Sequence, residues 1–311
     1  MSAVADALAT RPLVLDGGLA THLETLGHDL SDDLWSARLL RDDPGAVVTA
    51  HADHLRAGAE VLVTASYQAS VDGLVAHGAA PAEARRLIAS SVTRAREAAD
   101  LVGRGAPGEV WVAGSVGPYG AVLAGGQEYT GDYLDPSAPG RLDRAALRAF
   151  HAERMALLVE AGADVLACET VPGWLEVEAM LDAAEAAGAD VWVSLTAVAD
   201  PTEPSRLRTR RGEPVDAARV AEVAAHPRVV AVGVNCCEPG VATTAAALGA
   251  TVVYPNSGEV WDGAARVWRG SPEPVEGLAD GWLAAGARLV GGCCRVTPEQ
   301  VAGIAAVAAG R

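Results

Sequence analysis

The stretch that decides the fold is Val229-Val230-Ala231-Val232-Gly233-Val234-Asn235-Cys236, an apolar run that ends in an amide and a thiol. Similar short apolar runs recur along the chain, and helix-like stretches separate them. The eight runs begin near Leu13, Val61, Val110, Asp164, Val191, Val229, Thr251 and Arg288. Apolar strands that alternate with helices are typical of a parallel sheet buried on both faces. Eight such units in 311 residues predict one α/β domain, a closed (β/α)8 barrel of the TIM type over residues 1–311.

The segments between the runs agree with this architecture. Pro81-Ala82-Glu83 predicts a helix start, and residues 176–187 carry apolar side chains at helical spacing. Residues 103–108, 124–140 and 200–214 are rich in Gly, Pro and charge, so they are predicted to be loops. The first three units are long, and we expect extra loops on that side of the barrel.

Composition excludes several classes of function. All 24 basic side chains are Arg, and Schiff-base aldolases and pyridoxal-phosphate enzymes need a lysine. The net charge of -16 argues against nucleic acid or an anionic membrane as a partner. Residues 1–12 lack the basic flank of a signal peptide, and no apolar run has the length of a membrane span. Five cysteines then predict reduced thiols in the cytoplasm. The oligomeric state stays open, and a homo-oligomer is compatible with the sequence.

Distinctive residues gather where the predicted strands end. They include Asp16-Gly17-Gly18, Thr64 to Gln68, Gly114 to Tyr119, Cys168-Glu169-Thr170, Asn235-Cys236, Pro255 to Glu259 and Gly291 to Arg295. Barrel enzymes build their active sites at the C-terminal ends of the strands. We therefore expect these residues to share one rim of the barrel.

Three cysteines at this rim predict a metal site. Cysteine also packs as a small hydrophobic residue, and no CxxC motif is present, so an inert core is the competing interpretation. Cys236 and Cys293 would face each other across the rim, and Cys294 can join them only where its strand breaks, which Gly291 and Gly292 permit. Three thiolates suit a tetrahedral Zn²⁺ whose fourth position is open, the arrangement of a catalytic zinc.

Nine motifs in order resemble the homocysteine S-methyltransferase family, in the branch that uses S-methylmethionine or S-adenosylmethionine. The resemblance runs nearly end to end. The motifs are Leu15 to Thr21, Leu34 to Arg38, Thr64 to Ala69, Gly114 to Gly120, Glu128 to Tyr133, Cys168 to Thr170, Gly233 to Cys236, Tyr254 to Glu259 and Gly291 to Arg295. The resemblance implies that Cys236, Cys293 and Cys294 bind the zinc ion.

Roles for the other rim residues follow from this resemblance and from their chemistry. Glu169 is expected to bind the homocysteine ammonium group, with help from Asp16, while the backbone N–H groups of Gly17 and Gly18 hold the carboxylate. Thr64 is a further candidate for substrate binding, and Asn235 is expected to support the metal site or the substrate through hydrogen bonds. Trp35 would place an aromatic face near the donor cation.

The predicted activity is zinc-dependent methyl transfer from a sulfonium donor to L-homocysteine, which gives methionine. Zinc, Cys236, Cys293, Cys294 and Glu169 would carry the chemistry. Alternatives are betaine as donor, selenocysteine as acceptor, a barrel with a purely structural zinc, and the homocysteine module of a cobalamin-dependent enzyme whose partner supplies the cobalamin.

Three residues raise separate expectations. Leu195 stands where many relatives have Phe and is expected to reshape a wall near the pocket. Cys237 is an additional thiol whose side chain should point away from the metal, and Cys168 is expected to belong to the core.

Overall fold

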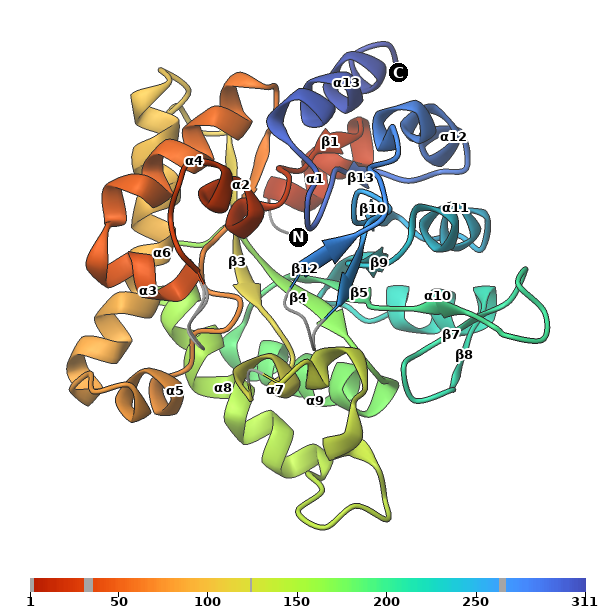
Figure 1. Cartoon of the computed structure of the whole chain (residues 1–311), viewed down its shortest axis with the longest axis horizontal. Coiled ribbons are helices and arrows are strands. Elements are labelled where there is room, and N and C mark those ends of the chain that lie inside the picture. The colour runs from red at the N-terminus through yellow and green to blue at the C-terminus, as the bar shows by residue number, and fades with distance from the viewer. Residues whose placement is uncertain (1–2, 31–35, 124, 263–266) are drawn as a thin grey trace.

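The computed structural model describes residues 3–30, 36–123, 125–262 and 267–311. Eight parallel strands form a ring at its centre, and helices surround the ring (Figure 1). The strands follow in the order β1-β13-β10-β9-β5-β4-β3-β2, and a parallel bridge between Leu15 and Val61 joins the two ends of that order. They are β1 (Leu13–Val14), β2 (Val61–Val63), β3 (Trp111–Val116), β4 (Val165–Val171), β5 (Val191–Leu195), β9 (Val229–Asn235), β10 (Val252–Tyr254) and β13 (Leu289–Val290). The predicted (β/α)8 barrel is confirmed, and each strand begins within one residue of its predicted start.

The strands are apolar along their length because both of their faces are buried. Leu13 and Leu15 belong to a core inside the barrel, whereas Val14 between them packs outward against the helices. Trp192 inside and Val193 outside repeat this alternation on β5. The sequence therefore shows unbroken apolar runs instead of an alternation of polar and apolar residues.

Helices cover the outside of the ring. The predicted helix starting at Pro81 is α6, and the predicted helix over residues 176–187 is part of α9. The helices that follow the strands around the ring are α4 (Pro44–Arg56), α6 (Pro81–Leu101), α8 (Arg144–Glu160), α9 (Trp174–Ala187), α10 (Ala217–Ala224), α11 (Pro239–Ala247), α12 (Ala279–Ala284) and α13 (Pro298–Ala308). Shorter segments are α2 (Leu19–Thr25), α3 (Ser36–Asp42), α5 (Val71–Ala76), α7 (Tyr119–Val122), and the 3-10 turns η1 (Gln127–Tyr129), η2 (Asp132–Leu134) and η3 (Val275–Leu278).

Two of the predicted loops contain regular structure. The segment after β5 folds into a small antiparallel sheet made of β6 (Val198–Ala199), β7 (Leu207–Arg208) and β8 (Pro214–Val215). The segment after β3 carries α7, η1 and η2. A further hairpin after β10, made of β11 (Val260–Asp262) and β12 (Val267–Arg269), was not predicted. These insertions all follow the C-terminal ends of strands, so they build the rim that carries the site.

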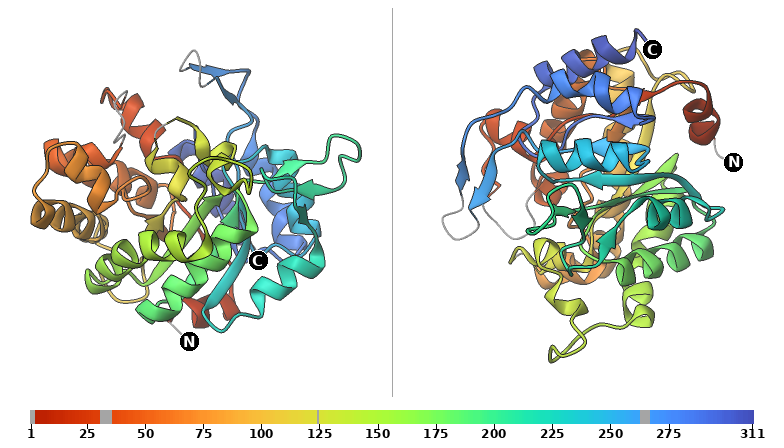
Figure 2. Two further views of the ribbon diagram at one scale, coloured as in Figure 1. Left: turned by 90° about the horizontal axis from the view of Figure 1, so that it is seen from below. Right: turned by 90° about the vertical axis from the view of Figure 1, so that its right-hand side faces the viewer.

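The helix α1 (Ala3–Thr10) closes the opposite end of the barrel. Its Val4 and Leu8 belong to the same hydrophobic cluster as the residues inside the ring. Figure 2 shows α1 at one end of the barrel and the β11–β12 hairpin projecting from the other. The interior is therefore a packed core that α1 closes at one end, and the C-terminal rim lies at the other end.

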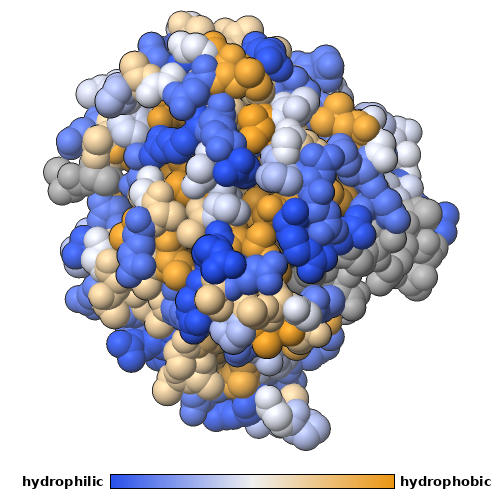
Figure 3. Space-filling view, turned by 90° about the vertical axis from the view of Figure 1, so that its left-hand side faces the viewer, coloured by the Kyte–Doolittle hydropathy of each residue, from blue (hydrophilic) through white to orange (hydrophobic). Residues whose placement is uncertain are grey.

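The outer surface is mixed in character. On the face shown in Figure 3, hydrophilic residues are interspersed with small hydrophobic areas. Among the residues whose burial is described, the large hydrophobic side chains that are exposed lie far apart in the sequence, at Leu26, Val75, Leu101 and Leu123. Among the helices of the described residues, none combines the length and the apolar character needed to cross a membrane.

Candidate active site at the C-terminal rim

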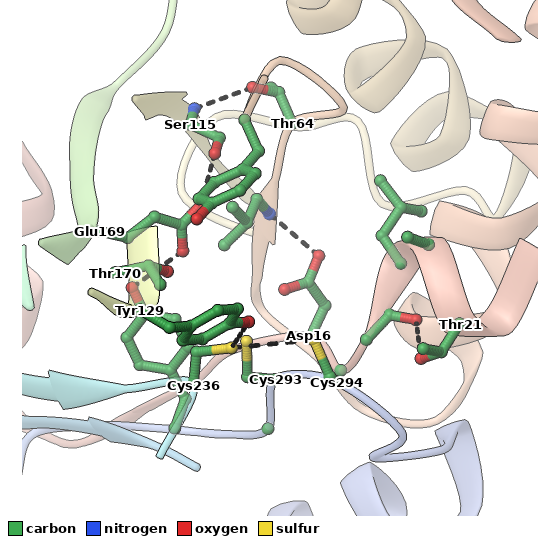
Figure 4. A pocket seen from close by; sticks show the side chains of 18 residues that line it. Asp16, Thr21, Thr64, Ser115, Tyr129, Glu169, Thr170, Cys236, Cys293 and Cys294 are labelled. Carbon is green, nitrogen blue, oxygen red and sulfur yellow. Dashed lines mark hydrogen bonds between the residues drawn. The ribbon is translucent and has the colours of Figure 1, made fainter. Parts of the chain in front are cut away.

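A pocket lies at the C-terminal ends of the strands, where the distinctive residues were predicted to meet (Figure 4). Loops after β1, β2, β3, β9 and β13 contribute to its wall, together with the ends of β3, β4 and β10. Its lining residues are Asp16, Gly17, Gly18, Leu19, Ala20, Thr21, Val63, Thr64, Tyr67, Ser115, Tyr129, Glu169, Thr170, Cys236, Tyr254, Gly292, Cys293 and Cys294. The structure thus brings three cysteines and two carboxyl groups into one cavity.

The three cysteines form a compact thiol cluster. The Sγ atoms of Cys236, Cys293 and Cys294 all lie within 4.8 Å of one another, and Cys236 and Cys294 are 3.8 Å apart. Ligands about 2.3 Å from a tetrahedral zinc ion would lie about 3.8 Å from one another. The cluster therefore has the chemistry and the spacing of a zinc site.

The three thiols of the cluster differ in how tightly they hold their protons. Hydrogen bonds from Cys293 and Cys294 hold the pKa of the Cys236 thiol well below its ordinary range. The contact with Cys236 raises the pKa of Cys293 and of Cys294. Three thiolates so close together would repel one another, whereas a bound metal ion would compensate their charge.

The strand β13 ends before the two adjacent cysteines, and the irregular backbone that follows lets both of their side chains reach the thiol cluster. β13 ends at Val290, and a Cβ atom on Gly292 would lie 2.1 Å from Val296 Cγ1. The N–H of Cys293 donates to the carbonyl of Pro255 (2.7 Å), and that of Cys294 donates to Asn256 Oδ1 (3.2 Å). The expectation that the strand breaks at the two glycines is confirmed.

Backbone strain is concentrated at the same rim. Among the described residues, three that are not glycine have positive φ: Thr170 (59°), Cys236 (47°) and Arg295 (67°). Thr170 and Cys236 line the pocket, and Arg295 directly follows the pocket residue Cys294. Such conformations persist where the surroundings enforce them, and they gather at functional sites.

Glu169 is a buried carboxylate with fixed orientation. It is 6% exposed and accepts hydrogen bonds from Ser115 Oγ and from the Tyr254 hydroxyl (3.0 Å). The Tyr254 hydroxyl is also bonded to Trp192 Nε1 (3.0 Å) and Ser194 Oγ (2.7 Å). Burial raises the pKa of Glu169 to about 7, against the lowering effect of Ser115 and Tyr254. A cationic group that entered the pocket would favour the ionised form.

Asp16 faces the same cavity. Its Oδ2 accepts from the N–H of Val63 (2.9 Å) and lies 4.0 Å from His51 Nδ1. Burial raises the pKa of Asp16 well above its usual value, and the nearby Glu169 adds to the effect. Two buried carboxyl groups that disfavour each other's charge are suited to binding one ammonium group between them.

The remaining predicted substrate residues are placed differently. The N–H of Gly18 donates to the carbonyl of Val296 (3.0 Å), which corrects the expectation that it holds a substrate carboxylate. A Cβ atom on Gly17 would lie 2.4 Å from the same carbonyl oxygen, so this position requires glycine for close packing. Thr64 lines the pocket, but its hydroxyl already accepts from the N–H of Ser115 (2.9 Å) and bonds to Ser66 Oγ (2.8 Å).

Asn235 is a buried side chain that contacts the thiol cluster. It is fully buried, its Oδ1 accepts from the N–H of Thr170 (2.7 Å), and its Nδ2 donates to Thr170 Oγ1 (2.8 Å). Nδ2 also lies 3.9 Å from Cys293 Sγ, within range of a hydrogen bond to sulfur. Of the two roles expected for Asn235, these contacts favour support of the metal site.

Four other residues singled out in the sequence do not line the pocket as the structure describes it. Cys168 and Cys237 are both buried in the core between the strands and the helices, as expected. Leu195 packs in this same core, so the expectation that it shapes a pocket wall is wrong. Its side chain points outward because Ser194, its neighbour on β5, points inward to Tyr254. Trp35 lies outside the described residues.

Sequence reasoning assigned no role to several residues that the structure places in the site. Ser115 and Tyr254 fix Glu169, and Tyr67 and Tyr129 form aromatic walls. The chain has only five tyrosines, and three of them line this pocket. The scarcity of tyrosine, together with its position at or after the ends of predicted strands, was the signal that could have found Tyr67, Tyr129 and Tyr254.

Fold and site together define a (β/α)8-barrel protein with a thiol-rich, carboxylate-containing pocket at its C-terminal rim. The chain belongs to the homocysteine S-methyltransferase family, whose model matches residues 13–308. The family that the motifs resemble is thereby confirmed.

Individual relatives align along nearly the whole chain. The homocysteine S-methyltransferase of Escherichia coli K12 is 44% identical over 308 residues and covers 94% of each chain. The Bacillus subtilis homocysteine S-methyltransferase YbgG is 38% identical over 332 residues and covers 98% of each. The metallated form of the E. coli homocysteine methyltransferase MmuM superposes with a TM-score of 0.80 at 41% identity, covering 95% of this chain and 96% of that one.

Proposed function

We propose that this chain binds Zn²⁺ through Cys236, Cys293 and Cys294 and transfers a methyl group from a sulfonium donor to L-homocysteine. The observation that carries the proposal is the cluster of three Sγ atoms within 4.8 Å, beside two buried carboxyl groups. The family and the metallated relative support the same assignment. The enzyme is a methyltransferase, and its product is methionine.

The metal would supply one part of the chemistry. Zinc, when bound, keeps a coordinated thiol in the thiolate form at neutral pH, where a free thiol with a pKa near 8.5 is mostly protonated. The methyl group passes from the sulfonium sulfur to the homocysteine sulfur. The donor leaves as a neutral thioether, and the thiol proton is released to solvent.

The residues of the chain orient the acceptor. Glu169 and Asp16 are proposed to bind the homocysteine ammonium group from two sides, because both carboxyl groups are buried and line the pocket. Ser115 and Tyr254 hold Glu169 in one orientation before substrate arrives. Fixed geometry of this kind lowers the entropic cost of bringing two reactants together.

The walls of the pocket suit a cationic donor. Tyr67 and Tyr129 line the cavity beside Cys236, and aromatic faces attract cations. Trp35 is proposed to add a third face. Charge is neutralised when a thiolate attacks a sulfonium, and a water-poor pocket favours that step.

Among donors we propose S-methylmethionine first, S-adenosylmethionine second and betaine third. The chain has no GxGxxG motif after its first strand that would indicate a dedicated nucleotide site. A neutral thioether is also a better leaving group than the tertiary amine that betaine would release.

A purely structural zinc is the second candidate, and it would need a fourth protein ligand. Cys237 was the thiol best placed in sequence to provide it, but its side chain is buried in the core outside the strands. The geometry therefore favours an open, catalytic site.

The test uses purified protein supplied with homocysteine and each donor in turn, with methionine measured and zinc content determined. Methionine formed with a sulfonium donor by a zinc-containing protein is the expected result. Turnover with betaine alone would overturn the donor assignment, and zinc without turnover with any donor would favour the structural role. Selenocysteine can be supplied in place of homocysteine in the same assay.

The small-molecule substrates are the partners that the proposal requires. We also propose that the protein works in the cytoplasm, where its five free cysteines would stay reduced. A homo-oligomer stays a prediction that light scattering of the purified protein can test.

A further inference from the structure

The small sheet β6–β8 presents two arginines to the rim of the pocket. Its β7–β8 turn is fixed, because the N–H of Thr209 donates to the Glu213 carbonyl (2.9 Å) and Thr209 Oγ1 donates to Glu213 Oε2 (2.8 Å). Arg210 and Arg211 lie in this turn. The proposed function gives the sheet no role, so the contacts of the two arginines are informative.

Arg210 contacts two segments that lead to the metal site. Its Nε donates to the carbonyl of Thr196 (3.1 Å), and its Nη2 donates to Thr196 Oγ1 (3.3 Å). Its guanidinium carbon lies 5.5 Å from the centre of the Tyr129 ring. Thr196 directly follows β5, whereas Tyr129 ends η1 in the loop after β3.

Both contacts continue to Cys236. Thr196 Oγ1 donates to the carbonyl of Cys236 (3.1 Å), and the Tyr129 hydroxyl lies 3.0 Å from Cys236 Sγ. One arginine is thus linked to the backbone of Cys236 through Thr196 and to its sulfur through Tyr129. Cys236 has a φ of 47°, a conformation that a cysteine adopts only when its surroundings enforce it.

We propose that Arg210 is a positioning residue for Cys236 and thereby sets how tightly the thiol cluster retains its metal. The inference rests on the proposed zinc ligands. The planar guanidinium can donate in parallel to Thr196 while its face stacks on Tyr129, and a lysine ammonium cannot do both. A tyrosine hydroxyl held on the thiolate sulfur offsets part of its charge and fixes its direction.

Arg211 provides a matched control. It lies in the same turn and grips the same loop through Thr130 O (3.4 Å), Asp132 Oδ1 (3.4 Å) and Asp135 Oδ2 (2.7 Å). These partners follow Tyr129 in the loop, and neither Tyr129 nor Thr196 is among them. Arg211→Met therefore removes a general anchor of the loop and leaves the Arg210 contacts in place.

The experiment compares zinc-loaded wild type with Arg210→Met, Arg210→Lys, Tyr129→Phe, Arg211→Met and the Arg210→Met/Tyr129→Phe double variant. Zinc transfer to a chromophoric chelator gives the dissociation constant and the release rate, and thermal unfolding of the metal-free proteins reports folding. Loss of a residue that orients a metal ligand typically weakens metal binding about 10- to 100-fold. We expect a loss in this range for both Arg210 variants and for Tyr129→Phe.

Arg211→Met should change the zinc dissociation constant less than about twofold, because its contacts go to Thr130, Asp132 and Asp135 and not to Thr196 or Tyr129. The double variant should bind zinc more weakly than either single variant. Its loss of zinc affinity should nevertheless be smaller than the product of the two single fold-losses, because Arg210 acts partly through Tyr129. Equal zinc loss in Arg211→Met and Arg210→Met, or wild-type retention in Arg210→Met, would overturn the inference alone. A wild-type protein that binds no zinc would overturn the proposed function, and the inference with it.

Discussion

Replacing Glu169 by Gln separates substrate binding from metal binding. The carboxylate accepts from both Ser115 and Tyr254, whereas a Gln amide offers one oxygen and two N–H donors. The variant therefore loses the negative charge and retains at most one of the two hydrogen bonds. The fold should persist, because the side chains have nearly the same shape.

The expected size of the effect follows from the proposed contact with an ammonium group. A hydrogen bond to a charged group in a buried site contributes about 1.5–3 kcal/mol. Its loss corresponds to a KM for homocysteine that is roughly 10- to 150-fold higher. Zinc content should stay at the wild-type level, because the cysteines follow β9 and β13 while Glu169 lies on β4.

The assay is steady-state kinetics with homocysteine varied at saturating donor, combined with metal analysis of the same samples. Glu153→Gln serves as the control, since Glu153 forms an exposed ion pair with Arg85. A KM for homocysteine that stays near the wild-type value in Glu169→Gln would refute the ammonium-binding role. A parallel loss of zinc would show that Glu169 acts on the metal site instead.

Further measurements test the metal ligands, the donor site and the buried charge. Cys293→Ser should lower bound zinc and abolish transfer while Cys168→Ser retains zinc, and metal analysis showing full zinc in Cys293→Ser would exclude the ligand assignment. Trp35→Ala should raise the donor KM more than the homocysteine KM, and unchanged donor kinetics would remove Trp35 from the donor site. The raised pKa of Glu169, about 7, means that the folded protein binds a proton more tightly than the unfolded chain. Stability from this group is therefore present below about pH 4.5 and is lost as pH rises through about 7, by at most about 3 kcal/mol. Denaturant titrations of the reduced, metal-free protein should show wild type losing stability relative to Glu169→Gln across that range, and a constant difference would contradict the raised pKa.

The sequence predicted the barrel well because its signal is local. Each strand is buried on both faces, so the eight apolar runs were visible without knowledge of their neighbours. The thiol cluster was predictable for a related reason: strand ends of a parallel barrel share one rim, so Cys236 and Cys293 had to approach each other.

What the sequence left open depends on contacts between distant segments. Packing between neighbouring segments explains two of these features. The N–H of Gly18 donates to the carbonyl of Val296, and the side chain of Leu195 points outward. Tyr129 reaches Cys236 from a loop with little periodic pattern, and the short strands after β5 have too few residues to show one. Such contacts are fixed by tertiary structure, which a single sequence reports only weakly.

The helix α1, which packs its Val4 and Leu8 into the barrel interior, has a consequence for the order of events in a catalytic cycle. With that end of the ring filled, both substrates and both products would enter and leave at the C-terminal rim, where the described residues form the pocket. Glu169 accepts a hydrogen bond from Tyr254, which packs among the residues inside the ring, so a group bound to Glu169 would lie toward the barrel interior. A donor that lies above it would block the way out. The acceptor would then enter first and its methylated form leave last, a sequence that product-inhibition patterns can reveal.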